Sequence, residues 1–436
     1  MKGVLEKARR AREAALKLAN LPDERRVGAL LQMAEEVRRR GDELLAANRK
    51  DLAAAEGKVS KAFFQRLKLS REKIEEIARM IESVARLPDP LGRTVYAMEM
   101  DEGLEVYKVT CPIGVIGAVF EARPDVLPQI SALCLRSGNA VILKGGKEAA
   151  NSNRAMYNLV KEVTEKAGVP AGWIQLIEAR EEVVKLLKLS DFIDLLIPRG
   201  SKEFVEFIQK NTTIPVLGHA AGVCHVYVDR AADVEKAVKI AYDAKVQYPA
   251  VCNAMESLLV HSEIAEEFLP RIAERYSKAG VEMRGCPKTL KILKGIKKAS
   301  AKDWGREYLD LVVSIKVVDS IDEAIEHINR YGTKHTDAIV TESKEAALKF
   351  LREVDSSSVM VNASTRFSDG YRYGLGAEVG ISTGKIHARG PVGLEGLTTT
   401  KYFVVGNGHV VADYVGVDAR RFTHRPLAKK WEEAIQ

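Results

Sequence analysis

The chain has 436 residues, 46% hydrophobic and 29% charged, and its 67 Lys and Arg against 60 Asp and Glu give a formal net charge of +7. This composition is typical of a large globular protein, excludes a disordered or collagen-like chain, and allows about three domains at roughly 150 residues each. The longest apolar run, 112–120, contains two glycines and is far shorter than the roughly 20 residues of a membrane helix, so we expect a soluble protein with no membrane partner.

The amino terminus is basic, but Glu6 and Glu13 interrupt it and no apolar segment follows, so no secretory signal is predicted. Five cysteines without paired spacing favour a reducing compartment over a disulfide framework, and they predict no metal site. We therefore expect a cytoplasmic protein in which one cysteine of the odd number is a reactive thiol.

In residues 1–86 apolar side chains recur three and four positions apart, which predicts a block of helices ended by Pro88 and Pro90. Two runs of β-favouring residues within 94–110 flank a polar turn containing Gly103, which predicts a hairpin.

From Gly114 onward, short apolar runs alternate with helical stretches, as expected for a parallel sheet with helical crossovers. The predicted strands up to Asp229 form a first doubly wound, nucleotide-binding-like domain. A second α/β unit begins with a helix at 234–245 and continues to the strand VMVNA at 359–363. The segment TTKYFVVGNGHVV at 399–411 predicts another hairpin.

Two glycine turns follow predicted strands and precede predicted helices: 144–147 (KGGK) and Gly200-Ser201. Helix N–H groups at such positions bind phosphate. No GxGxxG pattern follows either strand, so phosphate sites and plain tight turns are both open. The lysine run at 288–302 lacks interleaved aromatic residues, which favours a solvated face over nucleic-acid binding.

Cys252 differs from the other cysteines because VQYPAVCNAMES places it on a loop between a helix and a strand, among small residues. Backbone N–H groups near such a thiol stabilise a thiolate and an oxyanion. A catalytic thiol and a structural thiol both fit this pattern. His219 and His225, close to Cys224, also allow a Cys/His arrangement, although structural histidines fit equally.

Several strings resemble the gamma-glutamyl phosphate reductase family of the aldehyde dehydrogenase superfamily, over about residues 5–412. They are VFEARPD, SGNAVILKGGKEAANSN, IPRGS, VLGHAAGVCHVYVD, VQYPAVCNAMESLLVH and the stretch from VNASTRF to GLEGLTT. The resemblance implies an α/β fold of the aldehyde dehydrogenase type, with two doubly wound α/β domains and a β-hairpin oligomerisation module. The expected NADPH-binding domain comprises 1–93 and 113–228, the catalytic domain 229–396, the oligomerisation hairpins 94–112 and 397–412, and a basic C-terminal tail 413–436.

The same resemblance assigns roles to individual residues. The superfamily's nucleophilic cysteine falls on Cys252. Its cofactor-binding residues fall on Lys144 at the adenosine ribose, Gly200 and Ser201 at the pyrophosphate, and Glu307 at the nicotinamide ribose. The family uses NADPH, and Lys144 with Lys147 would suit its extra phosphate.

Two departures from the wider superfamily are informative. Hydrolytic members use a glutamate base in the segment that matches VLGHAAGVCHVYVD. In this chain no Asp or Glu occurs from 207 to 228. A thioester on Cys252 would then persist, which suits acyl exchange with phosphate. The oxyanion-holding asparagine of the Pro-Trp-Asn motif is replaced within 121–124, which leaves Asn253 as a candidate donor. Arg123 and Arg366 are candidates for binding the anionic groups of the substrate.

The resemblance implies NADPH-dependent reduction of L-glutamyl 5-phosphate to L-glutamate 5-semialdehyde and phosphate through a cysteine thioester, the second step of proline biosynthesis. It also implies a homo-oligomer of at least two chains, with a glutamate 5-kinase as a candidate partner. The alternatives are a coenzyme A-dependent acylating dehydrogenase of the same fold, a thiol hydrolase using Cys252 with His219, and a nucleic-acid binder acting through the 288–302 lysines.

Overall fold

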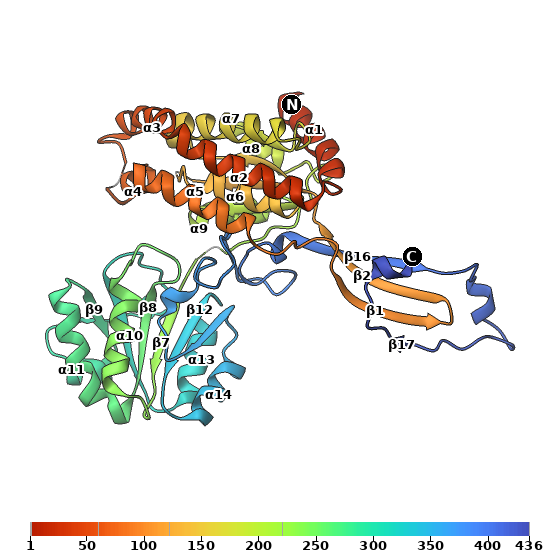
Figure 1. Ribbon diagram of the computed structural model, residues 1–436. Helices are drawn as coiled ribbons and strands as arrows, with labels where there is room; N and C mark the ends of the chain where they lie inside the picture. The colour runs from red at the N-terminus through yellow and green to blue at the C-terminus, as the bar shows by residue number, and fades with distance from the viewer. Residues whose placement is uncertain (1, 60, 122, 220, 436) are drawn as a thin grey trace.

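The computed structural model describes residues 2–59, 61–121, 123–219 and 221–435, so Ala122 of the replaced Pro-Trp-Asn segment lies outside the described residues. A helix-rich first domain lies above a second α/β domain in Figure 1, and a β-arm extends sideways from their junction. No helix of the described ranges combines the length and the apolar composition needed to cross a bilayer.

The first domain is built on a four-stranded parallel sheet of order β5-β4-β3-β6. Its strands are β3 (Val115–Phe120), β4 (Ala140–Lys144), β5 (Ile174–Leu176) and β6 (Leu195–Arg199). Its helices are α1 (Lys2–Leu18), α2 (Asp23–Arg39), α3 (Gly41–Ala55), α4 (Lys61–Leu67), α5 (Arg71–Ala85), α6 (Val126–Arg136), α7 (Ala150–Lys166), α8 (Arg180–Leu186) and α9 (Lys202–Lys210), with the short η1 (Lys147–Ala149) before α7.

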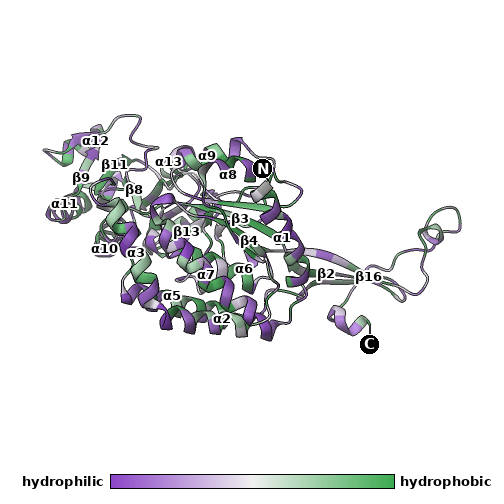
Figure 2. Ribbon diagram, turned by 90° about the horizontal axis from the view of Figure 1, so that it is seen from above, coloured by the Kyte–Doolittle hydropathy of each residue, from purple (hydrophilic) through white to green (hydrophobic). Residues whose placement is uncertain are grey.

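Helices cover both faces of this sheet, as predicted for a doubly wound domain. Along β3, Val115 and Val119 pack in the core beneath α1 and α8, whereas Ile116 and Ala118 pack in the core beneath α2, α5, α6 and α7. Successive strand residues face opposite sides, so a strand buried on both faces is a continuous apolar run. Figure 2 shows β3 and β4 as hydrophobic strands inside a layer of helices with hydrophilic outer faces.

The second domain contains a seven-stranded parallel sheet of order β10-β9-β11-β8-β7-β12-β13. Its strands are β7 (Cys224–Val228), β8 (Met255–His261), β9 (Glu282–Gly285), β10 (Lys297–Lys298), β11 (Val312–Val318), β12 (Thr336–Val340) and β13 (Ser358–Val361). Its helices are α10 (Val234–Val246), α11 (Ser262–Lys278), α12 (Pro287–Ile292), α13 (Ile321–Tyr331) and α14 (Lys344–Glu353).

Both predicted limits of the catalytic domain, 229 and 396, need correction. β7 pairs with β8 and β12, so the second sheet already begins at Cys224. At the other end, Ala377, Val379 and Val392 pack in the core of the first domain. This returning segment contains β14 (Ile381–Ser382), β15 (Gly390–Pro391) and η3 (Glu395–Leu397), after η2 (Thr365–Phe367) at the second domain.

The arm is an antiparallel sheet of order β16-β2-β1-β17. It consists of β1 (Thr94–Asp101), β2 (Leu104–Pro112), β16 (Thr398–Val405) and β17 (Arg425–Pro426), with η4 (Val411–Tyr414) and η5 (Trp431–Ala434). The hairpin at 94–110 is confirmed, but the predicted second hairpin is wrong, because β16 pairs with β2 along its whole length. The expected basic C-terminal tail, 413–436, packs on the arm, where Leu427 and Trp431 contact the core around Tyr107.

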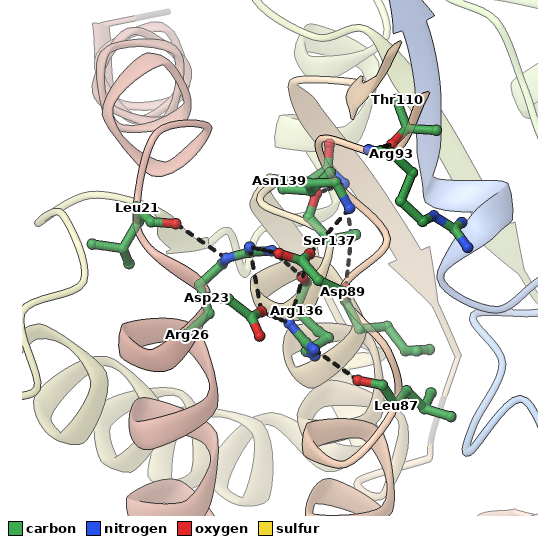
Figure 3. Close-up of polar contacts among 12 residues, drawn as sticks. Leu21, Asp23, Arg26, Leu87, Asp89, Arg93, Thr110, Arg136, Ser137 and Asn139 are labelled. Atoms are coloured by element: carbon green, nitrogen blue, oxygen red, sulfur yellow. Dashed lines mark hydrogen bonds and ion pairs between the residues drawn. The ribbon is translucent and has the colours of Figure 1, made fainter. Parts of the chain in front are cut away.

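Two buried guanidinium groups fix the linker that leads into the arm (Figure 3). Arg26 donates to the Asp89 carboxylate at 2.7 Å and to the Arg136 carbonyl at 2.7 Å. Arg136 in turn donates to the Asp23 carboxylate and to the Leu87 carbonyl. Because both arginines are almost fully buried, these bonds satisfy charges that water does not reach. The helices and the linker are therefore held as one unit at the base of the arm.

Candidate active site

A cavity of about 1190 Å³ lies where the carboxyl edge of the first sheet faces the amino edge of the second. Phe120 and Arg199 line it from the ends of β3 and β6, and Cys252 lines it from the turn before β8. Open α/β sheets bind ligands at the carboxyl ends of their strands. Six of the residues singled out in the sequence line this cavity: Arg123, Gly200, Ser201, His219, Cys252 and Glu307.

The turn that carries Cys252 is held from both domains. Cys224 donates its thiol hydrogen to the Cys252 carbonyl at 3.2 Å, and Arg66 of α4 donates to the Ala250 carbonyl at 2.9 Å. The loop before β7 approaches so closely that a Cβ on Gly222 would lie 1.9 Å from the Cys252 carbonyl oxygen. Only glycine fits at that position, so the loop and the half-buried thiol are fixed relative to each other.

Glu307 faces the same cavity and is held beside the thiol turn by the Gly222 N–H, which donates to its carboxylate at 2.8 Å. Burial raises the pKa of Glu307, and the hydrogen bond from Gly222 opposes that rise. A carboxylate in this position can accept hydrogen bonds from a sugar hydroxyl.

A buried ion pair that the sequence did not reveal fixes the chain just after Glu307. Glu256 accepts hydrogen bonds from the backbone N–H groups of Tyr308 and Leu309, each at 3.1 Å. Its other oxygen accepts from Lys245 Nζ at 2.6 Å, and both side chains are fully buried. The position of Glu307 therefore depends on this pair.

The amino terminus of α9 already holds an anionic group. Ser201 caps the helix through its hydroxyl, which accepts from the Phe204 N–H at 3.4 Å, and its own N–H donates to the Glu121 carboxylate at 3.2 Å. A Cβ on Gly200 would lie 2.8 Å from the Glu121 carboxyl carbon. Helix N-termini bind phosphate groups, and a phosphate at this helix would displace Glu121.

Arg123 and Arg199 place two positive charges in the cavity. Arg123 pairs with Asp125 at 3.3 Å, and Arg199 contacts Gln129 at 3.4 Å. Burial lowers the pKa of Arg199, and the carboxylates of Glu378 and Asp125 oppose that effect. The sequence reasoning missed Arg199, although a basic residue at a strand end directly before Gly200-Ser201 was an available signal.

Glu378 is a half-buried carboxylate in the cavity that the sequence reasoning also missed, because it lies outside the 207–228 segment searched for a base. Its carboxylate accepts from the Gly370 N–H at 2.8 Å. Burial raises the pKa of Glu378, and the charge of Arg199 lowers it.

Comparisons with known proteins agree with this geometry. Residues 2–289 match the aldehyde dehydrogenase family. A gamma-glutamyl phosphate reductase of Natronomonas pharaonis is 60% identical over 97% of both chains, and one of Haloquadratum walsbyi is 56% identical over 98% of this chain and 96% of its own. The chain belongs to the gamma-glutamyl phosphate reductase family of the aldehyde dehydrogenases. The crystal structure of gamma-glutamyl phosphate reductase from Thermotoga maritima superposes with a TM-score of 0.90 at 44% identity, covering 93% of this chain and 99% of that one. The predicted family and fold class are thereby confirmed.

Three residues expected at the site of this gamma-glutamyl phosphate reductase family member do not line the cavity. Lys144 lies at the same sheet edge, at the end of β4, where its Nζ donates to the Gly145 carbonyl at 2.9 Å. Asn253 is buried and donates its amide to the Ser368 carbonyl at 2.8 Å. Arg366 is buried behind the thiol turn, with Nε donating to the Gln247 side chain at 2.9 Å, and burial lowers its pKa.

Proposed function

We propose that this chain reduces L-glutamyl 5-phosphate to L-glutamate 5-semialdehyde and phosphate, with Cys252 as the nucleophile. One observation carries the proposal: a half-buried thiol opens into a cavity that is also lined by Arg123, Arg199 and a helix amino terminus. A nucleophile, cationic groups for an acidic acyl phosphate and a phosphate site thus occur together. Family membership supports the same reaction.

In this mechanism Cys252 Sγ attacks the acyl carbon, a carbon–sulfur bond forms, and the bond from carbon to the phosphate oxygen breaks. The resulting thioester divides one difficult displacement into two easier steps. Arg123 and Arg199 stabilise the negative charge of the departing phosphate. We assign the Cys252 backbone N–H as a donor to the oxygen that becomes negative. Asn253 and Arg366 are held by other groups, so we assign them to fixing the turn.

The residues of the cavity also fit a dinucleotide cofactor. The Ser201 N–H at the start of α9 would hold a pyrophosphate group in the position where Glu121 now lies, and the Glu307 carboxylate would hold a ribose. We propose NADPH, which supplies the hydride that reduces the thioester when it is bound. Lys144 and the exposed Lys147 would contact its additional phosphate from the end of β4.

The deciding experiment runs the reaction in reverse, because acyl phosphates are labile. Purified protein is given glutamate 5-semialdehyde and NADP⁺ with inorganic phosphate, with coenzyme A, or with neither. We expect NADP⁺ reduction that depends on phosphate and falls at least about 1000-fold in Cys252→Ala.

Each other outcome contradicts the proposal in a distinct way. Dependence on coenzyme A identifies an acylating dehydrogenase of the same fold. Reduction without either acceptor indicates hydrolysis of the thioester, with Glu378 as the base to test by Glu378→Gln. A separate forward assay with freshly prepared acyl phosphate tests the thiol hydrolase, which would release phosphate without NADPH oxidation.

Substrate binding has its own test. Removing the guanidinium in Arg199→Gln or Arg123→Ala should raise KM for phosphate roughly 10- to 100-fold in the reverse reaction, since hydrogen bonds to charged groups contribute about 1.5–3 kcal/mol. Arg154→Ala, an exposed arginine that pairs with Glu178 and does not line the cavity, is the matched control. An equal effect of all three substitutions would remove the assignment.

We further propose that the arm makes the protein at least a dimer in the cytoplasm. Large apolar side chains on β1 and β16 are exposed, among them Val95, Tyr402 and Val404. Exposed strands of this kind are normally covered by another chain. A glutamate 5-kinase is the proposed source of the labile acyl phosphate, and co-elution of the two enzymes tests that contact.

A further inference from the structure

Three potential metal ligands from distant parts of the sequence lie together, and two of them, His219 and Cys252, line the cavity. His219 precedes β7, Cys252 precedes β8 and His335 precedes β12. The Cys252 Sγ and one ring nitrogen of each histidine all lie within 4.8 Å of one another. The two imidazole rings meet edge to face, with centroids 4.7 Å apart.

The hydrogen bonds behind the two rings leave ligating atoms free. His219 Nδ1 lies 2.7 Å from the Ile381 carbonyl, which only accepts, so Nδ1 carries the proton and Nε2 keeps its lone pair. His335 is fully buried, its Nδ1 lies 2.9 Å from the Thr336 hydroxyl, and its Nε2 has no hydrogen-bond partner among the described residues. Histidines that bind metals are oriented by such a bond at the other ring nitrogen.

The charges around the cluster allow a cation. The carboxylates of Glu307 and Glu378 act on His219 as negative neighbours, against one positive neighbour, Arg199. Thiolate and imidazole are the ligands that zinc prefers, and three protein ligands with one open position are typical of accessible zinc sites.

We propose that His219, Cys252 and His335 form a site for Zn²⁺, which reversibly inactivates the enzyme by binding the thiolate. Zinc–ligand bonds of about 2.0–2.3 Å place tetrahedral ligand atoms roughly 3.5 Å apart, so side-chain rotations of the three residues bring them into range. Binding exchanges the thiol hydrogen for a sulfur–zinc bond and releases one proton to solvent. The inhibition rests on the proposed role of Cys252, whereas the metal binding does not.

Cobalt tests the binding without any activity measurement. Protein freed of metal by a chelator is titrated with Co²⁺, and a thiolate-to-cobalt charge-transfer band should appear at one equivalent per chain and disappear when Zn²⁺ is added. Cys252→Ala should lack the band, and His335→Gln should weaken Co²⁺ binding at least about 10-fold. His327→Gln is the matched control, because His327 is also buried with an unpartnered Nε2 among the described residues but lies outside the cluster.

The same variants separate the possible outcomes. Circular dichroism establishes that each one is folded, and Cys252→Ala tests the site independently if His335→Gln does not fold. Zn²⁺ should inhibit NADPH oxidation by the wild-type protein, and a chelator should restore it. Absence of a cysteine-dependent band, or equal Co²⁺ affinity in wild type and His335→Gln, overturns the site. A normal band in a protein that shows no phosphate-dependent reduction instead contradicts the proposed function alone.

Discussion

The buried pair of Lys245 and Glu256 makes a quantitative prediction about stability. Glu256→Gln keeps an oxygen for the Tyr308 and Leu309 N–H groups but leaves the Lys245 ammonium, which is fully buried, without a counter-charge. Removing one partner of a buried ion pair costs about 3–5 kcal/mol, whereas replacing both by neutral groups is far less costly. We expect Glu256→Gln to lose about 3–5 kcal/mol of unfolding free energy, and Lys245→Met/Glu256→Gln to recover all but about 1–2 kcal/mol of it.

The two single variants should respond to pH in opposite directions. Burial lowers the pKa of Lys245, so in Glu256→Gln the unfolded chain binds more protons than the folded one below the ordinary lysine pKa of about 10.4, and stability rises with pH. Burial raises the pKa of Glu256, so in Lys245→Met the folded chain binds more protons above the ordinary value of about 4.3, and stability falls as pH rises.

Urea denaturation at about pH 6 and about pH 9 measures both effects through the midpoint and slope of unfolding. The exposed pair Lys236 and Glu342, whose charged atoms are 3.0 Å apart, is the matched control, and its substitutions should each cost at most about 1 kcal/mol. Equal midpoints for Glu256→Gln and the double variant, or the same pH trend in both single variants, would refute the reasoning.

Three further predictions follow from close contacts and exposed surface. Gly222→Ala should lower the free energy of unfolding by about 1–3 kcal/mol and kcat about 100-fold, because the added Cβ would overlap the Cys252 carbonyl. Gly28→Ala in α2 is the control, since no atom lies within 4 Å of the added Cβ. In the same denaturation assay it should be neutral or stabilising by up to about 1 kcal/mol. Glu121→Gln should lower KM for NADPH about two- to five-fold by removing the charge at the start of α9, and an unchanged KM would place the pyrophosphate elsewhere. Light scattering at micromolar concentration should show that the wild-type protein is at least a dimer. Val404→Asp, on the exposed face of β16, should weaken this association. A monomeric wild-type protein would contradict the proposed interface.

The sequence by itself determined the local elements. The apolar spacing in 1–86 predicted helices because a side chain three or four positions away lies on the same helix face, and α1 to α5 confirm it. The alternation of buried strands with helical stretches predicted parallel sheets, and the helix expected at 234–245 agrees with α10 to within one residue. Spacing singled out Gly200, Ser201, His219 and Cys252, and the family resemblance added Arg123 and Glu307; all six line the cavity.

Only the tertiary structure decided which distant strands pair and which side chains meet. Nothing local distinguishes a last strand of the first sheet from β7, the first strand of the second, because both are apolar runs between helices. β16 pairs with β2, although the polar turn that follows β16 is typical of a hairpin. Arg199, Glu378 and His335 stand on separate elements without a shared motif. Arg199 and Glu378 line the cavity with the thiol because the two domains face each other, and His335 lies near the thiol because β8 and β12 belong to one sheet. The hydrophobic periodicity of the sequence indicates which face of a helix or strand is buried, whereas long-range packing determines which element that face contacts.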